Sequence, residues 1–243
     1  MLNINAILFV IYNFISIMRA LIFILPLLIC SCNYLIKPKS KIVDNNFAAA
    51  IRERCAICID TLNCLTKHAD TLTKLDVSGK KIATLEGFNF KGLEYFHCAG
   101  NQITALPDNL PAGLKHLFCH VNKIAVLPNN LPESLEILMC GDNQLTALPN
   151  KLPLGLTTIF CSNNQISALP TYLPANLEAI DCSRNQISSL PANLPANLEY
   201  LDCDNNKITA LPDSLPNNLS FFNFRGNPIE TIPANFPQRF LPE

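Results

Sequence analysis

Residues 177–197 read LEAIDCSRNQISSLPANLPAN, and the chain repeats this pattern every 21 residues without an insertion. The shared pattern is L-x-x-L-x-C-x-x-N-x-I-x-x-L-P-x-x-L-P-x-x. A fixed period of roughly 20–50 residues indicates a solenoid, in which each coil buries its apolar side by stacking on its neighbours. We therefore predict a repeat solenoid over residues 72–243. Its eight units begin at Leu72, Leu93, Leu114, Leu135, Leu156, Leu177, Leu198 and Leu219.

Each unit is numbered here from position 1, the leading leucine, to position 21. The apolar residues at positions 4 and 6 alternate with positions 3 and 5, which predicts a short strand with one buried side. Identical strands in successive coils should stack in parallel, about 4.8 Å apart. Positions 3, 5, 7 and 8 then point outward from the strands, and we call the surface they form the concave face.

Position 9 is asparagine in seven of the eight units, and the first unit has Lys80 instead. Here the chain turns away from the strand and leaves backbone groups unpaired inside the stack. An amide side chain can both donate to and accept from such groups, so we expect a structural role for the column. Its members are Asn101, Asn122, Asn143, Asn164, Asn185, Asn206 and Asn227.

Prolines recur at positions 15 and 19, for example at Pro107 and Pro111. Two prolines four residues apart exclude a regular helix, because proline has no backbone N–H and clashes with the preceding turn. The convex side of the solenoid should therefore be extended or polyproline-like.

Position 6 is cysteine in six consecutive units, with Val77 and Phe224 at the same position in the end units. The apolar end members indicate a core position at which cysteine acts as a small hydrophobe. Side chains stacked at the strand spacing do not converge as a disulfide requires, so we expect neither disulfides nor metal here. The column comprises Cys98, Cys119, Cys140, Cys161, Cys182 and Cys203.

The LPxxLPxxLxxLxCxxN unit resembles the bacterial subclass of leucine-rich repeats. That subclass occurs in secreted effectors, some of which are ubiquitin ligases with a separate catalytic domain after the repeats. The resemblance implies a leucine-rich-repeat horseshoe with parallel strands on its concave face and protein binding as its use. The segment 44–53 also resembles the helical cap of internalin-type bacterial proteins. We expect no ligase domain in this chain, because few residues follow the repeats.

Residues 1–32 are predicted to be a signal peptide, with an apolar core from Ala20 to Ile29 that follows Arg19. The stretch LICSC over residues 28–32 resembles the lipobox of bacterial lipoproteins, which implies lipid attachment at Cys32. Two alternatives stay open: an ordinary cleaved signal and an uncleaved membrane anchor. Met18 is a second candidate start codon. All of these alternatives place the repeats outside the cytoplasm.

Residues 33–43 are expected to form a solvated linker, and residues 44–71 a helical N-terminal cap. The run Asp44-Asn45-Asn46 offers N-caps for a helix through Phe47 to Arg52, and a second short helix is expected near Thr61 to His68.

Three cysteines and a histidine in the cap have the spacing C-x2-C-x5-C-x3-H. Three interpretations remain open: buried thiols, one disulfide suited to an exported chain, or a metal site. The residues are Cys55, Cys58, Cys64 and His68.

Apolar and aromatic side chains at outward positions indicate a binding surface, because solvent-facing strand positions are usually polar. The N-terminal half of the concave face is aromatic and apolar, and its C-terminal half is more acidic, with Asp204 and Phe221 alongside. The histidine pairs 116 with 120 and 97 with 116 are too far apart for metal chelation. The candidate partner-binding residues are Tyr95, His97, His116, Phe118, Ile137, Met139, Phe160, Asp181, Tyr200 and Asp202.

The chain holds 18 Lys and Arg against 19 Asp and Glu, which favours neither nucleic acid nor another strongly charged partner. No phosphate loop, GxSxG or HExxH motif is present, so we expect no enzyme and no cofactor. The sequence predicts an exported, monomeric scaffold that binds a protein. Two alternatives are a secreted effector, for example the substrate-recognition part of a ubiquitin-ligase assembly, and an envelope adhesin that binds glycan.

Overall fold

A computed structural model describes residues 41–241 of the chain. The expectations for the signal peptide over residues 1–32, and for lipid attachment at Cys32, lie outside the described residues. No helix between residues 41 and 241 combines the length and the apolar character that crossing a membrane requires.

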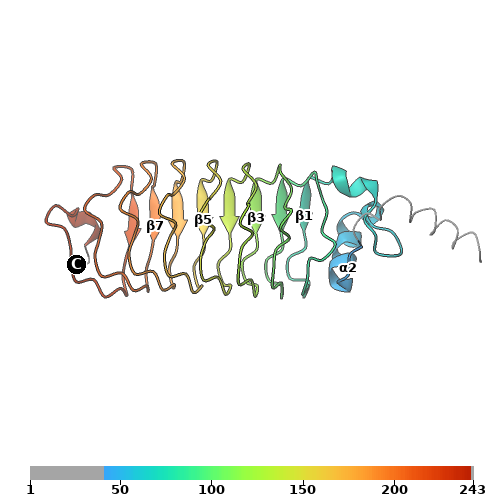
Figure 1. Cartoon of the computed structure of the whole chain (residues 1–243), viewed down its shortest axis with the longest axis horizontal. Helices are drawn as coiled ribbons and strands as arrows, with labels where there is room; N and C mark the ends of the chain where they lie inside the picture. Colours follow the sequence, from blue (N-terminus) through green and yellow to red (C-terminus); the bar gives the residue numbers. More distant parts are fainter. Residues whose placement is uncertain (1–40, 242–243) are drawn as a thin grey trace, which may run out of the picture. The chain divides into compact units, whose positions relative to one another are not determined.

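Eight three-residue strands form one parallel sheet in which each strand pairs with the next along the chain (Figure 1). The pairing is in register, so the same repeat position meets itself in every coil, as in Leu117↔Leu138. The predicted solenoid with a parallel sheet is confirmed. The strands are β1 (Lys74–Asp76), β2 (Tyr95–His97), β3 (His116–Phe118), β4 (Ile137–Met139), β5 (Thr158–Phe160), β6 (Ala179–Asp181), β7 (Tyr200–Asp202) and β8 (Phe221–Asn223).

A single apolar core runs through the stack. In the coil that begins at Leu135, the side chains of Leu135, Leu138, Cys140 and Leu145 are all fully buried. These are positions 1, 4, 6 and 11, which carry apolar side chains in every coil. One coil alone would expose this set, so burial requires the neighbouring coils.

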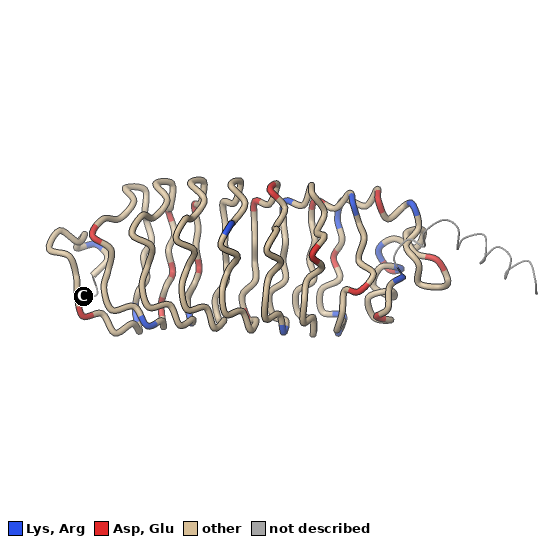
Figure 2. Tube along the Cα trace, in the orientation of Figure 1, with Lys and Arg blue, Asp and Glu red and all other residues tan. Residues whose placement is uncertain are grey.

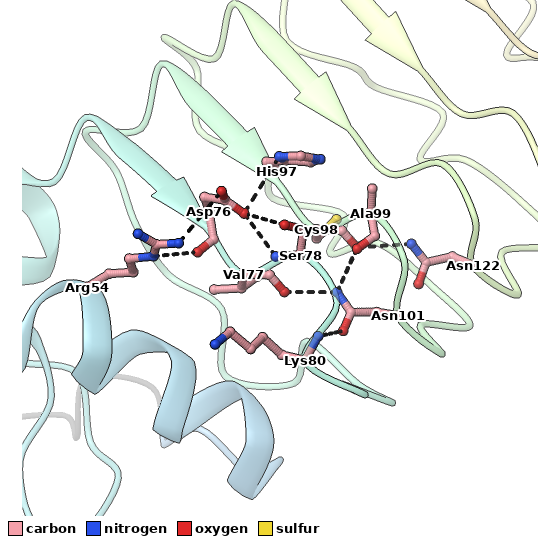
Figure 3. Close-up of polar contacts among 10 residues, drawn as sticks. All are labelled: Arg54, Asp76, Val77, Ser78, Lys80, His97, Cys98, Ala99, Asn101 and Asn122. Carbon is pink, nitrogen blue, oxygen red and sulfur yellow. Dashed lines mark hydrogen bonds and ion pairs between the residues drawn. The ribbon is translucent and has the colours of Figure 1, made fainter.

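The asparagine column satisfies the turn that follows each strand. The Nδ2 group of Asn143 donates to the carbonyls of Cys140 at 3.1 Å and Gly141 at 3.0 Å, and to Cys119 of the preceding coil at 3.1 Å. Its Oδ1 accepts from the N–H of Ile124, also in the preceding coil, at 2.9 Å. The amide therefore both donates and accepts, as predicted, and it joins two coils (Figure 3 shows the equivalent Asn101).

Position 8, just before this asparagine, has a positive φ in all eight coils. Gly, Asn and Asp occupy it in six of them, and these residues adopt the left-handed region most readily. Val121, with φ 54°, and Arg184, with φ 52°, adopt the same conformation. Valine is β-branched, so the turn forces Val121 into a backbone conformation that its side chain disfavours.

The connections between successive strands contain no helix from β1 to β8, which confirms the predicted extended convex side. The cysteine column is also as predicted: all six thiols are unbonded and buried among apolar groups. Burial raises the pKa of the Cys119 thiol, and likewise that of Cys161, to about 12. These thiols therefore stay protonated and act as core side chains.

The N-terminal cap is built on α2 (Asn45–Arg54), whose buried face includes Phe47 and Ile51. Of the three candidate N-caps, Asp44 caps the helix: its Oδ1 accepts from the N–H of Asn46 and that of Phe47. Its other oxygen, Oδ2, accepts from Ala83 N–H at 2.8 Å and Thr84 N–H at 3.3 Å, both in the first repeat. One carboxylate thus caps the helix and ties it to the solenoid.

The helix α2 lies beside β1, the first strand of the sheet, and covers the position that a preceding coil would occupy. Arg54 lies 3.8 Å from the Asp76 carboxylate at the end of β1 (Figure 3). Lys80, which replaces asparagine in the first unit, forms a 2.6 Å ion pair with Glu53 of α2. In the first coil, an ion pair with the cap therefore stands where the other coils have the hydrogen bonds of an asparagine amide.

The second short helix, expected near Thr61 to His68, begins only at Lys67, and residues 61–63 form a turn instead. Asp60 accepts hydrogen bonds from the N–H groups of Leu62 and Cys64, which makes a tight turn with Asn63 at a positive φ of 63°. Short 3-10 segments lie on either side, η1 (Ala56–Cys58) and η2 (Lys67–Thr71). A third one, η3 (Gln238–Phe240), follows the last strand.

The end of the expected linker, residues 41–43, belongs to the folded cap. Lys41 forms an isolated antiparallel bridge with Cys64, and Ile42 is fully buried. A solvated tether cannot therefore extend to residue 43, because this apolar side chain fills the cap core.

Of the three interpretations of the cap cysteines, the structure contains the disulfide, between Cys55 and Cys58. Neither sulfur is available as a thiolate ligand in this state. Within residues 41–241, no three His, Cys, Asp or Glu side chains are grouped so as to hold a metal ion.

We expect Asn143→Ala to lower the free energy of unfolding by about 1–3 kcal/mol, because three carbonyls and one N–H lose their partner inside the stack. Denaturant unfolding of the wild type and the variant measures this difference. A change within experimental error would contradict the structural role of the amide.

Acid should weaken the bond between cap and solenoid at Asp44. Burial raises the pKa of this carboxyl, but its four backbone hydrogen bonds outweigh burial and hold the pKa below its usual value. A depressed folded pKa stabilises the fold above the unfolded pKa of about 3.9, and this contribution is lost as the pH falls through the folded value.

We therefore expect Asp44→Asn to destabilise the protein by about 1 kcal/mol at neutral pH and by progressively less below about pH 4. Chemical unfolding of both proteins across this range tests the expectation. A difference that does not depend on pH would contradict it.

Candidate functional site

The sheet register aligns position 5 of successive coils into one column on the concave face. Phe118 pairs with Met139, and Met139 pairs with Phe160. His97 extends this column at the cap end, and Asp181 extends it at the other. The alignment of these five side chains, predicted from the repeat spacing, is confirmed, and each is half-buried.

Near the cap, four rings contact one another and form what we call the N-terminal aromatic cluster. The ring centroid of Tyr95 is 5.2 Å from that of Phe118 and 6.0 Å from that of His116. The His97 ring is 5.4 Å from Phe118. Tyr95 pairs with His116 and His97 pairs with Phe118 across β2 and β3, so the in-register sheet produces the cluster.

Both histidines of the N-terminal aromatic cluster lie beside carboxylates. His97 Nδ1 is 3.6 Å from Asp76 Oδ1 (Figure 3), and His116 Nε2 is 3.9 Å from Glu136 Oε2. The carboxylates come from the neighbouring coils, where positions 5 and 2 carry Asp and Glu. Sequence reasoning named the histidines and missed these partners, although the repeat numbering would have located them.

His120 makes a contact that the sequence reasoning did not consider. Its ring centroid lies 5.8 Å from that of His97, because position 7 of one coil meets position 5 of the coil before it. Within residues 41–241, the Nδ1 of His120 is the one buried side-chain nitrogen or oxygen without a hydrogen-bond partner. Burial, followed by the neighbouring His97, lowers the pKa of His120, so this ring stays neutral over a wider pH range.

A second group of rings lies toward the C-terminal end. Tyr200 and Phe221 are stacked almost in parallel, with centroids 4.5 Å apart and an interplanar angle of 5°. Phe160 lies 6.4 Å from Tyr200. Between them, β6 contributes only the small side chain of Ala179 at position 3. Ile137 and Met139 of β4 lie between the two aromatic groups and keep the face apolar.

Carboxylates line the same C-terminal part of the face. Asp202 accepts hydrogen bonds from Asp204 N–H and from the side-chain amide of Asn223. Burial raises the pKa of the Asp202 carboxyl, and the negative charges of Asp204 and Asp181 raise it further. The predicted division into an aromatic half and a more acidic half is therefore present.

The concave face thus offers broad apolar contact with flanking charge, which suits recognition of another macromolecule. Acidic and basic residues are interspersed along the whole row of coils (Figure 2). The role of the ten candidate residues in partner binding stays a prediction, because the structure holds the chain alone.

The comparisons with known proteins agree with this architecture. The family model described as Leucine Rich repeats (2 copies) matches residues 175–217. No curated protein sequence matches the chain.

Among solved structures, the chain is 32% identical to YopM from Yersinia enterocolitica WA-314, with a TM-score of 0.55. The match covers 69% of this chain and 40% of that one, so the chain spans less than half of the YopM structure. The functional domain of InlJ from Listeria monocytogenes, described as including a cysteine ladder, is 27% identical with a TM-score of 0.56. That match covers 76% of this chain and 46% of the InlJ domain.

A Shigella effector LRR domain is 30% identical with a TM-score of 0.63, and the match covers 76% of this chain and 77% of that domain. Together with the eight in-register coils and the asparagine column, this likeness shows that the chain belongs to the bacterial leucine-rich-repeat proteins.

Proposed function

We propose that this chain is an exported, lipid-anchored scaffold that binds a protein partner on its concave face and carries out no reaction itself. The observation that carries the proposal is the aromatic and apolar column of Phe118, Met139 and Phe160, only half-buried at outward positions of the strands. Such positions are usually polar in soluble proteins.

The core does not require these side chains. Positions 1, 4, 6 and 11 already fill the interior of each coil, and position 5 points away from it. Exposed aromatic groups favour association, and rings at the centre of an interface typically contribute most to affinity. A partner that covers the column would remove this apolar surface from water.

Leucine-rich-repeat relatives are typically interaction domains, which supports a scaffold and leaves the partner open. The likeness to the Shigella effector LRR domain supports a second candidate, a secreted effector without an anchor. The lipobox-like stretch at residues 28–32 favours the anchored form. Cell fractionation distinguishes them, because a lipid-anchored protein stays with the membrane pellet.

We expect Phe118→Ala combined with Phe160→Ala to abolish capture of the partner, since loss of interface aromatics costs about 2 kcal/mol or more each. The midpoint of thermal unfolding should change little, because both rings are half-exposed. Affinity capture followed by mass spectrometry identifies proteins retained by the wild type and lost with the variant.

The matched control is Asp108→Ala. Asp108 lies on the convex connection, so this variant should retain the same proteins as the wild type. Normal capture by the double variant would contradict the proposal. So would a loss of capture that follows only from unfolding, which circular dichroism detects.

We expect Cys32 to become the lipidated N-terminus of the mature protein. Metabolic labelling with a fatty acid should mark the wild type, and Cys32→Ala should abolish the label and release the protein from the membrane pellet. Cys30→Ala is the control and should keep the label. Labelling that survives Cys32→Ala would contradict this anchor.

A further inference from the structure

The C-terminal half of the concave face holds three carboxylates that form no ion pair in the described structure. In the part of the chain from residue 41 to 241, every ion pair lies before residue 152, and the last along the chain joins Lys151 to Glu133. Three carboxylates on β6, β7 and the turn after β7 accept hydrogen bonds from uncharged groups alone. They belong to Asp181, Asp202 and Asp204.

The basic residues nearby do not pair with these carboxylates. Lys207 donates to the side-chain carbonyl of Gln186 at 3.0 Å. Arg184 and Arg225 lie on neighbouring turns and form no ion pair with the three carboxylates in the described structure. The electrostatic effect on Asp202 comes from other carboxylates, which raise its pKa in addition to burial.

An aromatic surface adjoins these carboxylates. One face of the Tyr200 ring is covered by Phe221 of β8. Its other face is directed toward β6, where Ala179 pairs with Tyr200 and presents only a methyl group. Phe160 lies beyond Ala179, with its ring centroid 6.4 Å from that of Tyr200, and Asp181 follows Ala179 by two residues on the same strand.

We propose that Phe160, Ala179, Asp181, Tyr200 and Asp202 form a docking surface for an arginine side chain on an extended segment of the protein partner. The inference rests on the proposed function, because it places this arginine on the same face as the apolar column. Charge complementarity selects a cationic segment.

The arrangement of flat rings beside carboxylates selects arginine over lysine. A guanidinium group is planar, donates to a carboxylate through two parallel N–H groups, and stacks on an aromatic face. An ammonium group carries the same charge at a single point and is more strongly hydrated, so it gains less from the Tyr200 ring.

The test uses the full-length protein and two fluorescein-labelled probes, acetyl-hexaarginine amide and acetyl-hexalysine amide, in about 0.15 M NaCl, where long-range attraction is largely screened. Fluorescence anisotropy should show hexaarginine binding at least about fivefold more tightly than hexalysine. Asp181→Asn with Asp202→Asn should weaken hexaarginine binding about tenfold or more.

A second variant, Ala179→Ile, keeps every charge and places a larger side chain beside the Tyr200 ring, where it would compete with a stacked guanidinium. Isoleucine occurs at the same position in β4, as Ile137, so the fold accommodates it. We expect this variant to remove the preference for arginine and to unfold at the wild-type temperature. The matched charge control, Asp108→Asn with Asp213→Asn on the convex connections, should bind both probes as the wild type does.

Equal binding of the two probes by the wild type would overturn the inference. So would a convex control that weakens hexaarginine binding as much as Asp181→Asn with Asp202→Asn does. An unchanged arginine preference in Ala179→Ile would overturn it as well. If the wild type shows no arginine preference while Phe118→Ala with Phe160→Ala loses its partner, this inference is rejected and the proposed function stands. If that double variant still captures the partner, the proposed function is rejected.

Discussion

The amide of the position-9 asparagine is the interaction on which the rest of the structure depends. Each strand is three residues long, so the sheet itself supplies few of the bonds that join neighbouring coils. Asn143 bonds to the carbonyls that follow its own strand and to Cys119 of the coil before it. Because the same four bonds recur from coil to coil, every strand is placed at the same height as its neighbour.

This uniform register determines what the concave face can display. A one-residue slip would turn the outward side chains into the core, so the columns exist only because the turns are identical. Phe118, Met139 and Phe160 are far apart in the sequence and adjacent in space for this reason. The binding surface is therefore a consequence of the turn chemistry, and its composition can vary without disturbing the core.

The first coil shows how the structure compensates where the repeat is interrupted. At the first coil, Lys80 replaces the amide and pairs with Glu53, while Asp44 bonds to both α2 and the first repeat. These bonds replace those that a preceding coil would have supplied.

At position 8, the turn is kept even where the residue suits it poorly, as Val121 shows with its positive φ. Stacking on two neighbouring coils thus outweighs local backbone preference.

The sequence by itself determined the solenoid, the parallel sheet, the core positions and the helix-free convex side. Periodicity of 21 residues specifies each of these, because identical units must stack in identical ways. It also placed Asp44 among three candidate N-caps and identified the buried cysteine column, since both follow from local or repeated chemistry.

Only the tertiary structure decided the features that lack a period or that join different coils. The cap residues 55–71 occur once, so sequence reasoning placed a helix where Asp60 forms a turn, and it left the Cys55–Cys58 disulfide as one of three options. The contact between His97 and His120 joins different repeat positions of two adjacent coils, so a strand-by-strand alignment does not reveal it. Contacts between unlike positions depend on the offset and twist of adjacent strands, and that geometry is fixed only when the coils pack.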